Sequence, residues 1–275
     1  MLCRVIGVSR AGYYAWSKRG LSQRAQGDAD LTAEIRIIHA KSRHTYGSPR
    51  VHATLRACGQ RVGRKRVARL MRAASLRGRA PKRHVRTTVS DPQATPAPNL
   101  VARQFTASAM NRLWLTDITY LPTQEGWLYL AAMLDACSRR VVGWAMADHL
   151  RTELALEALE MALTTRRPAD GEVVHHSDRG CQYTAQAYQE VLNTHNIRCS
   201  MSRKGNCLDN AVAESFFATL KRELLPEQPW PTRPAARAAV FEWLAVFYNR
   251  QRRHSRLGYL TPVEFEERLA SGQAA

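Results

Sequence analysis

The order of strands and helices between residues 113 and 249 constrains this chain more than any other feature of its sequence. Alternating or short apolar runs predict strands at 113–122, 127–135, 141–147, 172–178 and 197–202. Helical spacing of apolar residues predicts helices at 152–166, 184–196, 205–221 and 235–249. This β-β-β-α-β-α-β-α-α order predicts an α/β fold, in which three antiparallel strands are extended by parallel strands and covered by helices.

Positive charge is concentrated at the beginning of the chain. The formal net charge of the 275 residues is +18, and residues 1–90 contain 21 Lys and Arg against 3 Asp and Glu. Residues 91–275 contain 20 of each kind. A basic module joined to a balanced one indicates a domain that binds a polyanion, attached to a domain with another task.

Residues 48–76 outline a helix-turn-helix. Ser48 and Pro49 fit the start of a first helix, Gly59 can end it, and a second helix follows a short turn at Gly63. The second predicted helix carries five basic residues away from its apolar side: Arg64, Lys65, Arg66, Arg69 and Arg72. Such a helix can read bases in the major groove, contact only phosphates, or present a solvated basic face, and the sequence leaves these alternatives open. Another helix is predicted at 31–42, and a short turn between helices at 7–16.

Four prolines between residues 81 and 98 predict an extended linker. The predicted domains are therefore a basic helical DNA-binding domain at 1–77, a linker at 78–108, an α/β core at 109–225 and a C-terminal helical extension at 226–275. The sequence has no apolar run of about 18 residues and no signal peptide pattern, so a cytoplasmic location without a membrane is expected. Six scattered cysteines form no CxxC pair, which argues for reduced thiols and against a zinc site.

Three carboxylates are candidates for a metal site. Asp117 lies in the first predicted strand, Asp178 ends the strand at 172–178, and Glu214 lies on the helix at 205–221. Neighbouring carboxylates repel each other, and a divalent cation removes that conflict. If the three converge, they form the ligand set of a two-magnesium phosphoryl-transfer site. Lys221 falls on the same helix face as Glu214, although both residues are also consistent with ordinary solvated helix charges.

Other charged residues have simpler interpretations. Asp209 is expected to cap the N-terminus of the helix that carries Glu214. Asp135 is expected to form a structural pair beside Arg139 and Arg140. A basic patch near the end of the chain has two open interpretations, a DNA-backbone contact or a solvated helix end, and it consists of Arg250, Arg252, Arg253 and His254.

The spacing of the three acids resembles a known signature. Asp117 and Asp178 are separated by 60 residues, and Asp178 and Glu214 by 35. This resembles the Asp-Asp-35-Glu pattern of the retroviral-integrase-like recombinases on the ribonuclease H-like fold. Several segments are similar to the transposase encoded by the second reading frame (OrfB) of the insertion-sequence-three family: GVSRAGYYAW, YGSPRVHATLR, WLTDITYLP, DACSRRVVGWA, HHSDRGCQY, SRKGNCLDNAVAESFFATLKRE and YNRQRRHSRLGYLTPVEF.

The resemblance implies a ribonuclease H-like mixed sheet preceded by a small basic all-α helix-turn-helix-like domain. It also implies that Asp117, Asp178 and Glu214 bind two Mg²⁺ ions, for which Mn²⁺ can substitute, and catalyse DNA end cleavage and strand transfer. Lys221 is then a DNA contact near the transposon terminus. Further DNA contacts are expected at Arg64, Lys65, Arg66, Arg69, Arg179, Asn210 and Arg253. Four more residues are expected to shape the site or touch DNA: His176, Gln182, Tyr183 and Asn206.

The partners that the resemblance implies are double-stranded DNA, both transposon ends and target, and further copies of the chain in a synaptic multimer. The leading helical segment begins close to Met1, so we also expect fusion with, or binding to, an upstream-frame helix-turn-helix protein. Association with the bacterial nucleoid follows. Two alternatives are a ribonuclease H-like nuclease that cuts without joining and a non-catalytic DNA-binding regulator. The basic module with its linker speaks against the first, and the intact set of acids speaks against the second.

Overall fold

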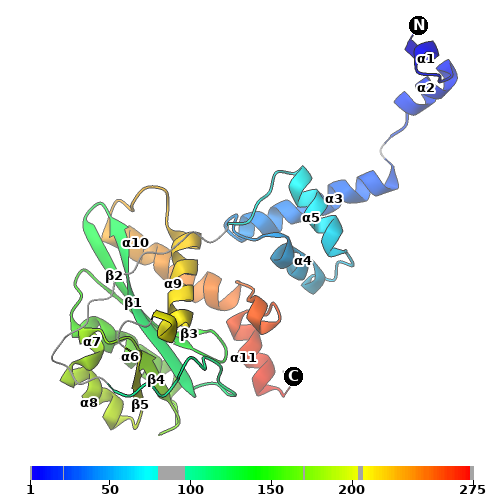
Figure 1. Ribbon diagram of the computed structural model, residues 1–275. Helices are drawn as coiled ribbons and strands as arrows, with labels where there is room; N and C mark the ends of the chain where they lie inside the picture. The colour runs from blue at the N-terminus through cyan, green and yellow to red at the C-terminus, as the bar shows by residue number, and fades with distance from the viewer. Residues whose placement is uncertain (1, 21, 80–96, 170, 204–206, 273–275) are drawn as a thin grey trace. The chain divides into compact units, whose positions relative to one another are not determined.

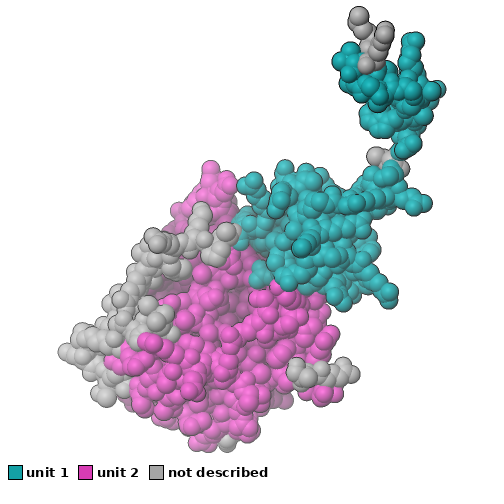
Figure 2. All heavy atoms as spheres, turned by 45° about the vertical axis from the view of Figure 1, so that its right-hand side comes forward, with its two compact units in different colours: residues 1–79 teal, residues 80–275 magenta. Residues whose placement is uncertain are grey.

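The computed structural model describes residues 2–20, 22–79, 97–169, 171–203 and 207–272 (Figure 1). The chain divides into two compact units, Met1–Arg79 and Ala80–Ala275 (Figure 2). Most of the predicted linker at 78–108 falls on residues 80–96, which lie outside the described residues. Among the residues that are described, no helix is long and apolar enough to cross a membrane.

The first unit is helical. Its helices are α1 (Leu2–Val5), α2 (Arg10–Ser17), α3 (Gln23–Lys41), α4 (Ser48–Ala57) and α5 (Arg64–Ala73). The last three contact one another and bury a small apolar core formed by Leu31, Ile35, Val51, Leu55, Val67, Leu70 and Met71. The two helices and the tight turn predicted within 48–76 are therefore present as α4 and α5.

The sequence prediction was wrong at residues 7–16. This stretch was expected to be a turn, but residues 10–17 form α2. The Ser9 hydroxyl accepts a hydrogen bond from the Gly12 amide at 3.0 Å, and this N-cap satisfies one of the amides that a helix start leaves without a partner. An N-cap also explains why α3 begins at Gln23, earlier than the predicted start at residue 31. Ser22 Oγ accepts a hydrogen bond from the Ala25 amide at 3.1 Å.

The second unit is built on one five-stranded sheet with the order β3-β2-β1-β4-β5. Its strands are β1 (Leu113–Thr123), β2 (Gly126–Asp135), β3 (Val141–Ala147), β4 (Val174–Ser177) and β5 (Arg198–Met201). The first three strands pair in antiparallel fashion, whereas β4 pairs in parallel with β1 and β5. The predicted mixed sheet is confirmed.

Helices cover both faces of the sheet (Figure 1). They are α6 (Thr152–Arg166), α7 (Cys181–Thr184), α8 (Gln186–Thr194), α9 (Ala211–Leu224), α10 (Arg233–Phe241) and α11 (Pro262–Ala270), with the short 3₁₀ turns η1 (Cys207–Asn210) and η3 (Ser255–Leu257). On one face α6 approaches very closely, since a Cβ on Gly143 would lie 2.1 Å from the Ala158 carbonyl oxygen. On the other face α9 contacts β1, and α10 contacts both β1 and β2. Leu121 of β1 and Leu128 and Leu130 of β2 are fully buried.

The helix predicted at 235–249 exists, but its second half has an unexpected form. Residues 242–248 form the π-helix η2 (Glu242–Tyr248), which continues directly from α10. The wider turn brings Trp243, Phe247 and Tyr248 into the core, and Trp243 and Tyr248 both contact the ring of Phe216 on α9. The C-terminal segment is thereby joined to the helix that carries Glu214.

Candidate active site

The pairing of β1 with β4 stops before β1 ends. Strand β4 pairs with β1 only between residues 113–115 and 174–176. Asp117 lies on β1 two residues beyond the last paired position, and Asp178 directly follows the end of β4. Because parallel strands run in the same direction, both carboxylates come to the same end of the sheet.

Helix α9 brings the third acid to this end. Asn210, the residue before α9, donates from Nδ2 to the carbonyl oxygen of Thr116 at 3.3 Å. This bond fixes the start of the helix beside Asp117. Glu214 lies in the first turn of α9, and Lys221 follows two turns later with a half-buried side chain. The helix then runs along β1, which it contacts (Figure 1).

The electrostatics link the three acids to one another. Burial raises the pKa of Asp117 well above its ordinary value, and the negative charges of Asp178 and Glu214 raise it further. The Ile118 amide, which donates to Asp117 Oδ1 at 2.8 Å, and the Lys221 ammonium act in the opposite direction. Burial in turn lowers the pKa of Lys221, while the charge of Asp117 raises it. The charges of Asp178, Glu214 and Lys221 therefore all act on the Asp117 carboxyl group.

The donor set fits a divalent cation in its chemistry. Asp117 is half-buried, the charges of Asp178 and Glu214 raise its pKa, and a cation is the partner that removes this repulsion. Within the described ranges, however, no three His, Cys, Asp or Glu side chains are close enough together to form a metal-holding group.

Several residues around Asp178 serve the fold of the site. His176 is buried and uses both ring nitrogens, Nδ1 with Ser200 Oγ at 2.8 Å and Nε2 with the Asp209 carbonyl oxygen at 2.7 Å. Gln182 donates to the Leu150 carbonyl oxygen at 2.7 Å. The buried Tyr183 hydroxyl lies 3.3 Å from Thr116 Oγ1, one residue before Asp117. Burial raises the pKa of Tyr183, and so does the charge of Asp117.

Asp209 does not cap α9, so that prediction was wrong. Its carboxylate is buried and accepts from Arg203 Nε at 2.9 Å, from Arg103 Nε at 3.2 Å and from Asn99 Nδ2 at 2.9 Å. The hydrogen bond from Arg203 is the main reason why the pKa of Asp209 is well below its usual range. Two guanidinium groups outcompete neutral helix amides, because hydrogen bonds between opposite charges are stronger.

Asp135 is structural, but its ionic partner is not the expected one. Its carboxylate is buried and accepts from the amides of Asn111, Cys137 and Ser138. The nearest guanidinium in an ion pair is that of Arg166 on α6, at 3.7 Å, and not that of Arg139 or Arg140. Arg166 also binds Glu266 of α11 through two bonds of 2.6 and 2.9 Å, and this buried acid was not foreseen.

The four residues of α5 that were predicted to contact DNA fall into two groups. Arg64 and Lys65 are exposed. Arg66 and Arg69 are also exposed, but both bind Asp28 of α3, at 2.7 and 2.5 Å. Asp28 was missed, although it is one of only three acids within residues 1–90. The structure therefore leaves the side chains of Arg64 and Lys65 to solvent and holds the other two against α3.

The remaining predicted DNA contacts are engaged inside the second unit. Arg179 donates to the Ser202 carbonyl oxygen at 2.8 Å, and Arg253 donates to the Tyr259 carbonyl oxygen at 2.9 Å. Asn210 is buried. Arg252, from the predicted basic patch, is also buried, so a solvated helix end is the wrong interpretation for this residue. Asn206 lies outside the described residues.

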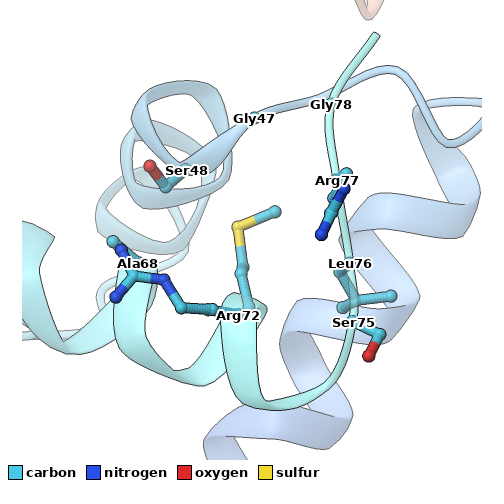
Figure 3. Close-up of a pocket in the computed structure, with 9 residues that line it drawn as sticks. Gly47, Ser48, Ala68, Arg72, Ser75, Leu76, Arg77 and Gly78 are labelled. Carbon is cyan, nitrogen blue, oxygen red and sulfur yellow. The ribbon is translucent and has the colours of Figure 1, made fainter.

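A pocket of about 380 Å³ lies within the helical unit, between the start of α4 and the segment after α5 (Figure 3). It is lined by Gly47, Ser48, Ala68, Met71, Arg72, Ser75, Leu76, Arg77 and Gly78. Gly78 packs so closely on Gly47 that a Cβ would lie 2.6 Å from the Gly47 nitrogen. The pocket contains none of the site residues predicted from sequence.

Comparisons with known proteins agree with this arrangement. Two families described as Integrase core domain match residues 107–207 and 195–262, and a family described as HTH-like domain matches residues 26–84. The transposase InsF of insertion sequence IS3A from Escherichia coli (strain K12) is 41% identical over 269 residues, which are 97% of this chain and 93% of that protein. The chain belongs to the IS3 family of transposases.

A second relative also belongs to an insertion element. A 31 kDa protein of insertion element IS600 from Shigella sonnei is 44% identical to this transposase over 267 residues, which cover 97% of this chain and 98% of that protein. Together with the strand order, the integrase core matches confirm the predicted ribonuclease H-like fold class. The transposase is therefore an enzyme of the polynucleotidyl transferase class, with a helix-turn-helix-like domain before its core.

Two solved structures are similar to the transposase. The catalytic core domain of HTLV-2 integrase in complex with magnesium is 17% identical, with a TM-score of 0.43, and the match covers 58% of this chain and 98% of that one. A chain of the simian T-cell lymphotropic virus intasome, in complex with the PP2A regulatory subunit B56 gamma, is 14% identical, with a TM-score of 0.49. That match covers 85% of this chain and 74% of the other.

Proposed function

We propose that this transposase cuts DNA at the ends of an insertion sequence and joins those ends to target DNA, with Asp117, Asp178 and Glu214 as the catalytic carboxylates. The observation that carries the proposal is the raised pKa of Asp117, caused by burial and then by the charges of Asp178 and Glu214. The ionised form of a half-buried carboxylate is unfavourable when two other negative charges act on it. It becomes favourable when divalent cations bind.

Two Mg²⁺ ions are the proposed cofactors, held by the same three acids. Bound Mg²⁺ supplies Lewis-acid stabilisation of phosphoryl oxygens and lowers the pKa of a bound water or hydroxyl group. Manganese, a cation with similar oxygen ligands, is proposed as a substitute.

The protein's own groups orient the site. The Ile118 amide holds Asp117 Oδ1, and the Gly180 amide donates to Asp178 Oδ1 at 2.9 Å. The Lys221 ammonium, near Asp117, supplies the positive charge that receives a DNA phosphate beside the acids.

DNA is proposed to contact both units. In the helical unit, Arg64 and Lys65 on α5 are exposed, while Arg66 and Arg69 contact phosphates in competition with Asp28. Arg179, Asn210 and Arg253 are proposed as contacts that form only after local rearrangement, since each is engaged or buried here.

The working parts of the chain are proposed to be residues 1–77, 78–108, 109–225 and 226–275, as predicted. We also propose that the protein forms a homo-multimer that holds two transposon ends. It is proposed to be linked to the upstream-frame helix-turn-helix protein and to be located in the cytoplasm, associated with the nucleoid. The multimer is proposed because transposition requires two DNA ends to meet, and the location is proposed because DNA is the substrate.

Strand transfer with pre-cut 3′ ends tests the proposed activity. Asp178→Ala is expected to abolish both cleavage and joining in Mg²⁺ and to leave DNA binding intact. Asp148→Ala is the matched control, because Asp148 is an exposed carboxylate in the turn after β3, and it should keep full activity. Undiminished activity of Asp178→Ala contradicts the assignment of the acids. Cleavage without joining in the unaltered protein supports the nuclease alternative.

A further inference from the structure

Thr116 lies on β1 at the point where the pairing with β4 has just ended. The Arg112 carbonyl oxygen accepts from the Val174 amide at 2.9 Å, so the Arg112 carbonyl group points toward β4. Alternate residues of a strand direct their carbonyl groups to the same side, so the Thr116 carbonyl group also points toward β4. Beyond the last paired residue it accepts a hydrogen bond from Asn210 Nδ2 at 3.3 Å. The loop before α9 is thereby attached to β1.

The Thr116 hydroxyl group takes part in a chain of two hydrogen bonds. Thr116 Oγ1 donates to the Ala132 carbonyl oxygen on β2 at 3.1 Å. Because a hydroxyl group has a single proton, the Tyr183 hydroxyl, at 3.3 Å, is the donor of the second bond and Thr116 Oγ1 its acceptor. Both hydroxyl groups are almost completely buried, where a polar group without partners would be costly.

Tyr183 is joined to Asp178 by the turn between them. The Gly180 amide donates to Asp178 Oδ1 at 2.9 Å, and the Gly180 carbonyl oxygen accepts from the Tyr183 amide at 3.0 Å. The Tyr183 ring is buried edge-to-face against Tyr188, with ring centroids 5.4 Å apart. The bond from Tyr183 to Thr116 therefore attaches the turn that holds Asp178 to β1.

The third acid is attached to the same residue. Asn210 is buried and directly precedes α9, and Glu214 lies in the first turn of that helix. Thr116 itself directly precedes Asp117 on β1. The three segments that carry the acids thus meet at Thr116: one through its peptide bond, one through its hydroxyl group and one through its carbonyl group.

We propose that Thr116 is a positioning residue for the acidic site, and that its hydroxyl group limits how far Asp178 can move from Asp117. This inference rests on the proposed function, because it concerns acids that are assigned there to metal binding. Valine has the shape of threonine and suits a strand equally well, but it can neither accept from Tyr183 nor donate to Ala132. Groups that orient metal ligands contribute to metal affinity although they do not touch the metal.

Manganese binding by the full chain tests the inference without catalysis. Free Mn²⁺ is measured in the absence of DNA by its electron paramagnetic resonance signal, which bound Mn²⁺ does not contribute to. Thr116→Val is expected to weaken Mn²⁺ binding roughly tenfold. Thr116→Ser restores a hydroxyl group and should retain most of the affinity.

Tyr183→Phe tests the same bond from its other end. It removes only the donor hydroxyl group, and it should weaken Mn²⁺ binding to an extent similar to Thr116→Val. Because the two groups belong to one chain of hydrogen bonds, the double variant should bind Mn²⁺ no more weakly than Thr116→Val alone. If Thr116→Val does not fold, Tyr183→Phe decides the question.

Two matched controls remove buried hydroxyl groups elsewhere in the same unit. Thr123, at the other end of β1, donates from Oγ1 to the Gly126 carbonyl oxygen at 2.6 Å, and the Tyr188 hydroxyl lies 2.9 Å from His175 Nε2. Thr123→Val and Tyr188→Phe should bind Mn²⁺ as the unaltered protein does. An equal loss of Mn²⁺ affinity in these controls would contradict the inference, because the loss of any buried hydroxyl group would then suffice.

Asp178→Ala separates the failure of this inference from the failure of the proposed function. If the unaltered protein binds no Mn²⁺, or if Asp178→Ala binds it as tightly, the proposed metal ligands are wrong. If Asp178→Ala loses Mn²⁺ while Thr116→Val and Tyr183→Phe bind it normally, the acids keep their assignment and the role of Thr116 is wrong.

Discussion

The Arg252 guanidinium binds the Glu223 carboxylate through two hydrogen bonds of 2.8 Å each, and both side chains are almost completely buried. Glu223 lies two residues after Lys221 on α9, whereas Arg252 follows the π-helix. The pair therefore attaches the C-terminal segment to the helix that carries Glu214. The position of α9 along β1 depends on residues that follow it by almost 30 positions.

Removing one partner of this pair should destabilise the second unit. Arg252→Met leaves the Glu223 charge buried, which we expect to lower the free energy of unfolding by about 3 kcal/mol or more. Urea unfolding measures the loss. The double variant Arg252→Met/Glu223→Leu should recover much of it, because no charge remains buried. A double variant as unstable as the single one would show that packing, and not charge, is lost.

Asp117 should be a source of instability when no cation is bound. Its pKa is raised in the folded protein, so the folded state holds a proton more tightly than the unfolded state does. Stability then falls as pH rises from the ordinary pKa of 3.8 through the raised value. Asp117→Asn removes this effect, and its melting temperature in EDTA at pH 7 should exceed that of the unaltered protein by roughly 2–4 °C.

The same variant should lose its response to metal. Mg²⁺ should raise the melting temperature of the unaltered protein, because a ligand that binds only the folded state stabilises it. Asp117→Asn should show no such rise, whereas Asp148→Asn, an exposed acid outside the site, should respond fully. Equal responses in both variants would remove Asp117 from the metal site.

Local sequence patterns predicted most of the second unit. The alternation of apolar residues in β1 to β3 and the spacing of leucines in α6 are local patterns. The order of strands and helices along the chain could therefore be predicted from them. The candidate site was predicted from the spacing of Asp117, Asp178 and Glu214, because that spacing resembles a known signature. Their mutual charge effects depend on the tertiary fold, which no local pattern contains.

The errors have a common physical cause, which is pairing over long distances in the chain. Asp209 was given a local role as a cap, yet one of its partners, Arg103, is 106 positions away. Glu266 binds Arg166, 100 positions away, and this contact decides which arginine lies near Asp135. The opposite error occurred at α2, where a local N-cap by Ser9 was overlooked and the segment was expected to be a turn.

Asp209 should stabilise the protein in a manner that depends on pH. Its pKa is lowered in the folded state, mainly by the hydrogen bond from Arg203. A lowered pKa contributes stability that is present above the unfolded value of 3.8 and lost as pH falls through the folded value. Asp209→Asn should therefore cost about 1–2 kcal/mol at pH 7, a modest figure because both guanidinium partners are half exposed. Urea unfolding of both proteins should give closer values as the pH is lowered below 3.8, and a difference that stays constant would contradict the charge argument.

Asp28 should limit the affinity of the helical unit for DNA. It holds Arg66 and Arg69 through ion pairs on α3, and these bonds, Arg69 first, lower the pKa of its carboxyl group. Asp28→Asn releases both guanidinium groups toward phosphates. Binding to a duplex should tighten, and the slope of log K against log salt should become steeper by about 1–2 units.

Asp30→Asn provides the control for this change. Asp30 is an exposed acid two residues further along α3, so its replacement alters the net charge by the same amount. If only Asp28→Asn steepens the salt dependence, the two released arginines are the cause. If both variants behave alike, net charge alone explains the gain, and the pairing of Asp28 with α5 has no role in DNA binding.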